Sequence, residues 1–333
     1  MIGFRLNRAL VAGSRPMALA IGNFDGIHLG HQAILNAVVT AARNNDLTPA
    51  AMSFEPMPRE FFARLKNDVT SAPPRLMSVT EKLAAFVVAG IQCAFVPRFD
   101  AAFAGQSPEQ FVDALTRMNV RWLIVGDDFR FGAKRGGDVA MLRAAGHAHG
   151  FHVETMNDVF ANQVRVSSTA VREALARGDL DSARRMLGAP YKIVGRVIHG
   201  KRLGRTLGFP TANVSLGASA RRQRPALGGV FAVKCRLVTR GLEGVAGKSG
   251  MILNGVANLG TNPVVSSENH PHLEVFLFDF SGDLYGQRLE VAFIEKIRDE
   301  LKFASLDALV VQMHDDARRA KNILRMMDDG SKS

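Results

Sequence analysis

The first 187 residues alternate short apolar segments with helical ones, and this pattern restricts the fold more than any other feature of the sequence. The apolar segments are continuous runs, without the polar alternation of a half-exposed strand. They occupy residues 17–21, 50–54, 94–97 and 122–125, and residues 152–156 are expected to be a further extended segment. Helical patterns occupy residues 28–44, 81–89, 108–118 and 139–149. Continuous apolar strands between helices predict a parallel sheet that is covered on both faces.

A different pattern begins near Gly188-Ala189-Pro190. Period-two alternation replaces the long helices over residues 191–198, 230–237, 251–259, 273–280 and 288–293, and a final helix is expected at 306–326. This pattern predicts an antiparallel barrel or sandwich. With 333 residues and roughly 150 residues per domain, we expect two domains, 1–187 and 188–333.

Composition limits the class of protein and its partners. Hydrophobic residues make up 47% and charged residues 22%, which excludes a disordered chain, a collagen and a coiled coil. The net charge of +11 suits anionic partners such as nucleotides. Cys93 and Cys235 lie far apart, without the spacing of a disulfide framework or a zinc cluster. The apolar run 17–21 is too short to span a membrane, so we expect a cytoplasmic protein.

The strongest local motif is Gly22-Asn23-Phe24-Asp25-Gly26-Ile27-His28-Leu29-Gly30-His31, which follows the first strand and opens the first helix. Free backbone N–H groups and the helix dipole attract phosphate at such a turn. His28 and His31 are three residues apart, so both can face one side of the helix and donate to phosphate oxygens. Metal binding lacks an evident third ligand, and a purely structural turn remains the other alternative. The segment is not a P-loop, because no Lys-Ser/Thr follows its glycines.

A second phosphate signal lies at Val166-Ser167-Ser168-Thr169. Ser168 or Thr169 can cap a helix over residues 170–177. If Thr169 is the cap, Arg172 takes the position where a capping box has Glu or Gln. A cation there is unfavourable unless an anion lies nearby. ATP phosphate is one candidate, and an ion pair with an acidic neighbour such as Glu173 or Asp179 is the other.

The segment 195–213 combines four glycines with four cations and indicates a phosphate cradle. Thr211 and Asn213 share one strand face and offer neutral oxygens that suit Mg²⁺. In the strand 273–280, Glu274 shares a face with Phe276 and Phe278. A carboxylate beside aromatic rings is desolvated and becomes more basic, as a general base requires. The alternative is an exposed carboxylate at the start of a strand.

The motifs of both halves resemble known families. The turn 22–31 resembles the HxGH nucleotidyltransferases in their flavin adenylyltransferase form, and the segments 53–58, 126–132 and 166–172 continue that resemblance. The run Gly208-Phe209-Pro210-Thr211-Ala212-Asn213 is similar to the hallmark of riboflavin kinase. Further matches are the segments 229–233, 255–260, 273–280, 284–286 and 297–303. In this order they resemble the bifunctional prokaryotic riboflavin kinase/FAD synthetases.

The resemblance implies an α/β Rossmann-like nucleotidyltransferase domain followed by an antiparallel β-barrel with a C-terminal helix. The implied activities are phosphorylation of riboflavin to FMN and adenylylation of FMN to FAD, with ATP as co-substrate and Mg²⁺ as cofactor. In the first domain the implied ATP-binding residues are Gly22, Asn23, Phe24, Asp25, Gly26, His28, His31, Ser168, Thr169 and Arg172, and the flavin-binding residues are Asp128 and Phe129. In the second domain the implied ATP-binding residues are Gly200, Lys201, Gly204, Arg205, Thr211 and Asn213. Thr211 and Asn213 are also the implied metal ligands. The implied flavin-binding residues are Arg298 and Glu274, and Glu274 is also the implied base.

Two departures keep a second function open. Met57 stands where the family has His, and Asn262-Pro263-Val264 stands where the kinase usually reads Arg-Pro-Thr. A riboflavin kinase with weak or lost adenylyltransferase activity is therefore an alternative. A basic RNA-binding module is an alternative of another class, but aromatic residues are only 7% and no stacking pair accompanies the basic segments. We expect small-molecule partners, no nucleic acid and no membrane, and leave weak self-association open.

Overall fold

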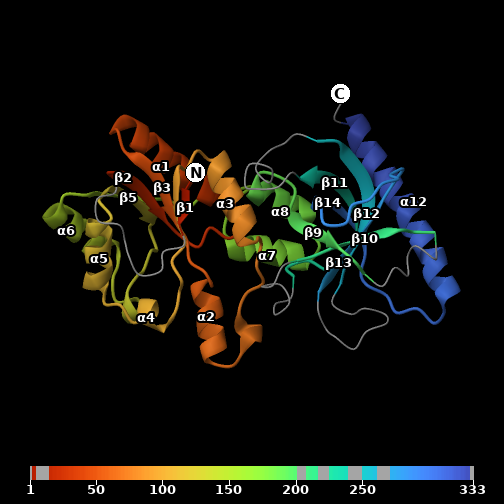
Figure 1. Cartoon of the computed structure of the whole chain (residues 1–333), viewed down its shortest axis with the longest axis horizontal. Coiled ribbons are helices and arrows are strands. Elements are labelled where there is room, and N and C mark those ends of the chain that lie inside the picture. The colour runs from red at the N-terminus through yellow and green to blue at the C-terminus, as the bar shows by residue number, and fades with distance from the viewer. Residues whose placement is uncertain are drawn as a thin grey trace. The chain divides into compact units, whose positions relative to one another are not determined.

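The computed structural model describes residues 2–4, 15–200, 208–216, 225–238, 250–260 and 271–330. The chain forms two compact units, which are described separately below (Figure 1). The first comprises Met1–Pro73 and Lys82–Val166, and the second comprises Pro74–Glu81 and Ser167–Ser333. Within the described ranges, no helix has the length and apolarity needed to cross a membrane.

The first unit is built on a parallel sheet, as predicted. Its strands are β1 (Ile2–Phe4), β2 (Met17–Ile21), β3 (Thr48–Met52), β4 (Cys93–Phe95), β5 (Val120–Gly126) and β6 (His152–Met156). Their order is β1-β4-β3-β2-β5-β6, and every neighbouring pair is parallel. The sequence pattern did not predict the edge strand β1 or the short antiparallel hairpin of β7 (Phe160–Ala161) and β8 (Val164–Arg165).

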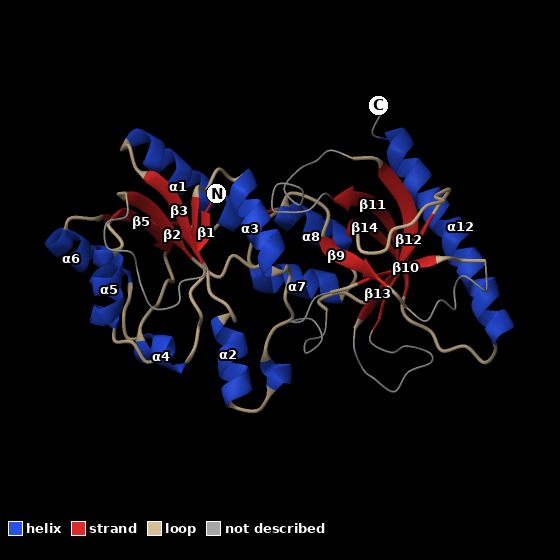
Figure 2. Ribbon diagram, viewed as in Figure 1, coloured by secondary structure: helices blue, strands red, loops and turns tan. Residues whose placement is uncertain are grey.

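The helices of this unit are α1 (Leu29–Asn44), α2 (Pro58–Leu65), α3 (Val79–Val88), α4 (Ala101–Ala104), α5 (Pro108–Arg117) and α6 (Val139–His149) (Figure 2). The first three residues of α3 are assigned to the second unit. They enclose two cores, one on each face of the sheet. Ala18 and Ala20 of β2 face the core that includes Leu35 of α1. Leu19 faces the other core, which includes Leu115 of α5. Because both of its faces are buried in these cores, β2 is apolar throughout.

The second unit contains the predicted barrel, and its described strands close on themselves. They are β9 (Lys192–Ile198), β10 (Thr211–Val214), β11 (Gly229–Val238), β12 (Ile252–Gly260), β13 (His272–Leu277) and β14 (Arg288–Arg298). The order is β10-β13-β12-β11-β14-β9, β9 also pairs with β10, and all pairs are antiparallel. β14 runs on to Arg298, beyond its predicted end at 293. β13 ends at Leu277, before its predicted end, and Asp279 just beyond it has a positive φ of 53°.

Alternate residues of each strand fill the barrel. The fully buried inner set comprises Phe231, Val233, Cys235, Ala257, Leu259, Leu273, Val275, Leu289, Val291 and Phe293. The C-terminal helix α12 (Leu306–Gly330) packs on the outer face. There Ala320 and Leu324 belong to the same apolar cluster as Val230 and Ala232 of β11. The outer face therefore has an apolar part under α12, and the predicted kinase residues lie on that same face.

Two further helices, α7 (Ser168–Ala176) and α8 (Leu180–Leu187), belong to the second unit, where α8 lies beside β14. Gly188 ends α8 with a φ of 76°, so the change in sequence pattern at residue 188 marks a helix end. Glu81 also belongs to this unit. Its carboxylate accepts hydrogen bonds from the backbone N–H groups of Val194 (2.8 Å) and Ser78 (2.7 Å). Burial raises the pKa of Glu81, and these hydrogen bonds oppose the shift.

Candidate functional site

The predicted phosphate turn connects β2 to α1 at the carboxyl edge of the parallel sheet, where ligands of such sheets bind. Gly26 has a φ of 90°, and the non-glycine residues Phe24 and Ile27 also have positive φ values of 47° and 44°. Backbone strain of this kind persists only where the surroundings enforce it, and it concentrates at functional sites. Here the buried Phe24 ring packs edge-to-face on Phe86, with centroids 5.3 Å apart.

His28 and His31 face the same side of α1, as predicted. Their rings stack with centroids 3.7 Å apart and planes 18° apart. His28 is the N-cap of α1, and its Nδ1 accepts a hydrogen bond from the N–H of His31 (3.3 Å). This bond assigns the proton of a neutral His28 to Nε2, which can then donate. The arrangement places two imidazoles at a helix N-terminus, where backbone N–H groups favour phosphate.

Lys82 of α3 contacts this turn, and the sequence analysis missed it. It is only 3% exposed, and its Nζ donates to the carbonyl of Asn23 (2.7 Å) and to Ser53 Oγ (2.9 Å). Ser53 Oγ in turn donates to the same carbonyl (3.0 Å). A buried cation thus ties the turn to the end of β3. The one signal in the sequence is a single lysine directly before the apolar run 83–88.

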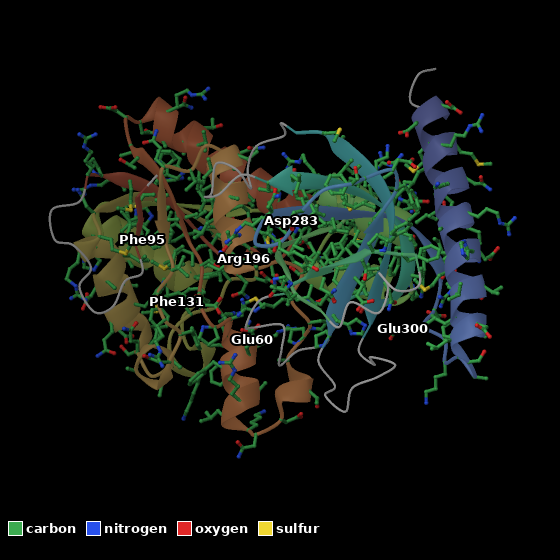
Figure 3. All side chains as sticks on the ribbon, turned by 45° about the vertical axis from the view of Figure 1, so that its right-hand side comes forward. Glu60, Phe95, Phe131, Arg196, Asp283 and Glu300 are labelled. Atoms are coloured by element: carbon green, nitrogen blue, oxygen red, sulfur yellow. The ribbon has the colours of Figure 1, made fainter. Side chains whose placement is uncertain are left out.

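The predicted flavin residues Asp128 and Phe129 follow β5. The Asp128 side chain is 81% exposed, and one Arg165 nitrogen lies 3.9 Å from it. Phe129 stacks on Phe131, labelled in Figure 3, with centroids 5.9 Å apart. Phe131 continues a chain of touching rings made by Phe111, Phe103, Phe99, Phe54, Phe61 and Phe62. Phe62 is 45% exposed, so this aromatic chain reaches the surface.

Met57, at the position where the resemblance implies a His, is buried at the N-cap of α2. Its N–H donates to the carboxylate of Glu60 (3.1 Å), another buried residue that Figure 3 labels. Position 57 in this chain is therefore an apolar packing position at a helix start.

The expected cap of α7 was wrong by at least one residue. Ser167 is the N-cap, and its Oγ accepts a hydrogen bond from the N–H of Ala170 (3.1 Å). Ser168 and Thr169 lie in the first turn, so Arg172 is not at the third helical position. Its Nε donates to the carbonyl of Pro74 (2.7 Å). The argument that the helix dipole at this position requires an anion therefore fails, and ATP binding by Arg172 stays a prediction.

In the barrel, strand register brings together three of the predicted kinase residues. Asn213 of β10 lies directly opposite Glu274 of β13, and Thr211 lies opposite the next outer residue, Phe276. Directly opposite residues of an antiparallel pair point to the same side, with Cβ atoms about 4.5–5.5 Å apart. On its other side Glu274 lies opposite Asn258 of β12. Glu274 thus lies in a polar row between two asparagines, half-buried as they are.

Of the remaining residues predicted to bind phosphate in the kinase half, the structure describes only the first. Gly200 is described, and a Cβ there would overlap the side chain of Asn213, so a larger residue at position 200 would displace that side chain. Lys201, Gly204 and Arg205 lie outside the described residues, as do Asn262 and Val264. Among the described residues, no cluster of three or more His, Cys, Asp or Glu side chains could hold a metal.

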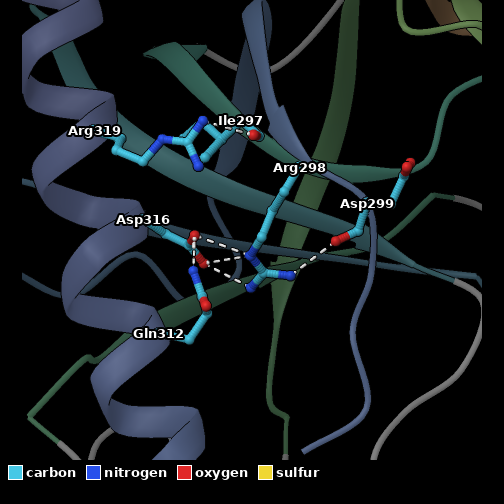
Figure 4. Close-up of polar contacts among 6 residues, drawn as sticks. All are labelled: Ile297, Arg298, Asp299, Gln312, Asp316 and Arg319. Atoms are coloured by element: carbon cyan, nitrogen blue, oxygen red, sulfur yellow. Dashed lines mark hydrogen bonds and ion pairs between the residues drawn. The ribbon is translucent and has the colours of Figure 1, made fainter.

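The predicted flavin residue Arg298 forms an ion pair with α12 (Figure 4). Its Nη2 donates to Asp316 Oδ2 (2.6 Å) and its Nε to Oδ1 (2.9 Å). Gln312 donates to the same carboxylate (3.0 Å), and Nη1 of Arg298 donates to the carbonyl of Asp299 (2.9 Å). The arginine and aspartate side chains are 15% and 5% exposed. Asp316 therefore orients Arg298 and fastens α12 to the barrel.

The two units define a class of enzyme in which a Rossmann-like nucleotide-binding unit precedes a β-barrel unit with a C-terminal helix. Two family models match the chain, FAD synthetase over residues 11–170 and riboflavin kinase over residues 187–324. The chain belongs to the bifunctional riboflavin kinase/FMN adenylyltransferase family. A member from Haemophilus influenzae is 46% identical, over 91% of this chain and 93% of the relative. Members from Escherichia coli K12 (43%, over 91% of each chain) and Pseudomonas fluorescens (41%, over 92% and 93%) are also similar.

A solved structure agrees in fold over almost the whole chain. It is a crystal structure described as a macrolide-efflux protein from Streptococcus pneumoniae, with a TM-score of 0.78 and 27% identity. The match covers 97% of this chain and 99% of that chain.

Proposed function

We propose that the chain catalyses two successive transfers from ATP. The second unit phosphorylates riboflavin to FMN, and the first unit adenylylates FMN to FAD with release of pyrophosphate. The observation that carries the kinase assignment is the cross-strand row of Asn213, Glu274 and Asn258, which presents a carboxylate between neutral oxygen ligands. We keep residues 1–187 and 188–333 as the domains of the two activities.

In the kinase step, Glu274 accepts the proton of the riboflavin 5′-hydroxyl as that oxygen attacks the γ-phosphorus of ATP, and ADP leaves. The position of Glu274 supports this role, because its strand neighbours supply the polar groups that phosphoryl transfer needs for positioning. Gly200, which abuts Asn213 of β10, comes directly before the residues predicted to hold the phosphates of ATP. Arg298, fixed by Asp316, would orient the flavin.

The residues on β10 suit Mg²⁺ by their chemistry. Thr211 and Asn213 carry neutral oxygens on the face of Glu274. Mg²⁺ commonly takes few protein ligands and keeps waters and substrate phosphate as the others. Thr211 and Asn213 would hold the ion, which neutralises phosphate charge when bound.

In the adenylyl transfer, a phosphate oxygen of FMN attacks the α-phosphorus of a second ATP, and pyrophosphate leaves. His28 and His31 donate hydrogen bonds to the phosphate as its charge increases. Their stacked rings and the buried cation of Lys82 support this role. Ser168, Thr169 and Arg172 would add ATP contacts, and Asp128 and Phe129 would lie beside the flavin.

One pair of assays tests both halves. The protein is incubated with ATP and Mg²⁺, starting from riboflavin or from FMN, and FMN and FAD are separated by chromatography. Glu274→Gln should slow FMN formation by about 10²–10⁴-fold while sparing FAD formation from FMN. His28→Ala or His31→Ala should do the reverse, by about 10²–10³-fold. A wild-type protein that produces only FMN would leave riboflavin kinase as its sole activity, and RNA binding without ATP turnover would reject the proposal.

A further inference from the structure

Two buried polar atoms on the outer face of the barrel lack a hydrogen-bond partner among the described residues. They are Oδ1 of Asn258 on β12 and Nδ1 of His272 on β13. Buried polar groups are nearly always paired, so two unpaired ones close together need an explanation. Asn258 lies directly opposite Glu274, and His272 lies opposite Gly260, two residues further along β12. Both atoms therefore adjoin the proposed base.

Glu274 has different neighbours on its two sides, because β13 pairs with β10 on one side and with β12 on the other. On the β10 side lie Asn213 and, against it, Gly200, which begins the predicted phosphate cradle. Asn258 and Gly260 lie on the β12 side. Phosphoryl transfer requires the attacking and leaving oxygens roughly in line, so ATP and the acceptor lie on opposite sides of the transferred group. If the nucleotide approaches from β10, the acceptor alcohol extends along β12 and the start of β13.

Nearby glycine geometry leaves room for a carboxylate on this side. A Cβ at Gly260 would collide with the side chain of Glu300, which Figure 3 labels. Glu300 thus lies against the strand next to His272, at the level where Gly260 and His272 pair. The β12 side is consequently lined by an amide, an imidazole and a carboxylate, a set that suits a neutral chain of hydroxyl groups.

The hydrogen-bonding properties of Asn258 Oδ1 and His272 Nδ1 limit which groups they can bind. An amide oxygen accepts hydrogen bonds only, so Asn258 Oδ1 needs an O–H or N–H donor. Asn258 and His272 are diagonal neighbours on adjacent antiparallel strands, a relation that places residues about 7–8 Å apart. Asn258 and His272 could therefore contact different hydroxyls of one extended polyol. In riboflavin, the hydroxyls nearest the reacting 5′ position belong to the ribityl chain.

We propose that Asn258 and His272 bind the ribityl hydroxyls of riboflavin and thereby hold the 5′-hydroxyl at Glu274. This inference rests on the proposed kinase activity. It makes the two residues determinants of specificity, which discriminate a flavin with a polyol chain from one without it.

The test compares riboflavin with a flavin that carries a methyl group in place of the ribityl chain. Asn258→Leu keeps the size of the side chain and removes the acceptor. The KM for riboflavin should rise about 3- to 10-fold, the effect of one neutral hydrogen bond. The inhibition constant of the methyl flavin against riboflavin phosphorylation should not change. Asn254→Leu is the matched control, because Asn254 is on the same face of β12, where it pairs with Lys234. His272→Phe provides a second variant.

Every possible result of this test either supports or rejects the proposal. A selective rise in the riboflavin KM in either variant supports the proposal. Equal rises for riboflavin and the methyl flavin would indicate general distortion and reject it, as would unchanged constants. A rise in the KM for ATP–Mg²⁺ alone would place Asn258 on the nucleotide side and also reject it. If Asn258→Leu does not fold, judged by circular dichroism, His272→Phe decides. Failure of the wild-type protein to form FMN would instead reject the kinase activity itself.

Discussion

Removing the carboxylate of Asp316 should weaken the attachment of α12 to the barrel. In the protein, Asp316 accepts hydrogen bonds from Arg298 and from Gln312. Asp316→Ala leaves the guanidinium of Arg298, whose side chain is 15% exposed, without its counter-charge. Breaking a buried pair from one side typically costs about 3–5 kcal/mol. For a unit of this size, 1 kcal/mol corresponds to about 2–4 °C in Tm, so the kinase transition should fall by about 6–20 °C.

The neighbouring residue supplies the control. Asp315 forms an ion pair with Arg318 on the exposed side of α12, where the side chains are 36% and 72% exposed. Such a surface pair contributes about 1 kcal/mol or less, so Asp315→Ala should shift Tm by a few degrees at most.

The assay follows loss of riboflavin kinase activity on heating, together with circular dichroism, because two units can unfold in separate transitions. In an Asp316→Ala background, Arg298→Met should cost less stability than it does alone, since the uncompensated charge is gone. Equal small shifts for Asp316→Ala and Asp315→Ala would refute the reasoning. So would additive effects in the double variant.

Three further changes test other features. Lys82→Met removes the buried cation and one of the two donors to the Asn23 carbonyl, the other being Ser53 Oγ, and should slow FAD formation at least about 10-fold. FMN formation is the internal control, and an unaffected rate of FAD formation would show that the cation is dispensable. Burial raises the pKa of Glu81, so its protonation favours the folded state. The stability of the wild type relative to Glu81→Gln should therefore increase as the pH falls through that raised value toward the ordinary one, and a constant difference in urea titrations would contradict this. A fragment from Leu187 should still phosphorylate riboflavin, but be less stable than one from Ser167, because α8 lies beside β14; a folded but inactive fragment would disprove the domain assignment.

Periodicity predicted most of the sheet and the barrel because it records which face of an element is buried. The strand β6 and the helix α6 have the predicted bounds. Short elements were missed: α4 has four residues and α2 has eight, too few to show a helical period. The cap of α7 failed for a different reason. Ser167, Ser168 and Thr169 can all act as caps, and local sequence cannot choose among them.

Contacts between side chains that are far apart in the sequence could not be predicted from periodicity or local motifs. Lys82 meets Asn23 across 59 positions, and Arg298 meets Asp316 across 18. Neither pair follows from a local motif, since the partners meet only once the sheet or the barrel has formed. The histidine pair was predictable because its partners are three residues apart within one helix.

The same distinction explains how the proposed kinase site depends on its core. Glu274 lies on the outer face because Leu273 and Val275, its neighbours on β13, point inward and are fully buried. A shift of one residue in register would turn Glu274 into the barrel and Val275 out to the polar row. Burial of two apolar side chains opposes that shift, so these residues position the proposed base without touching a substrate. The chemistry of this outer face is therefore determined by the packing of the inner one.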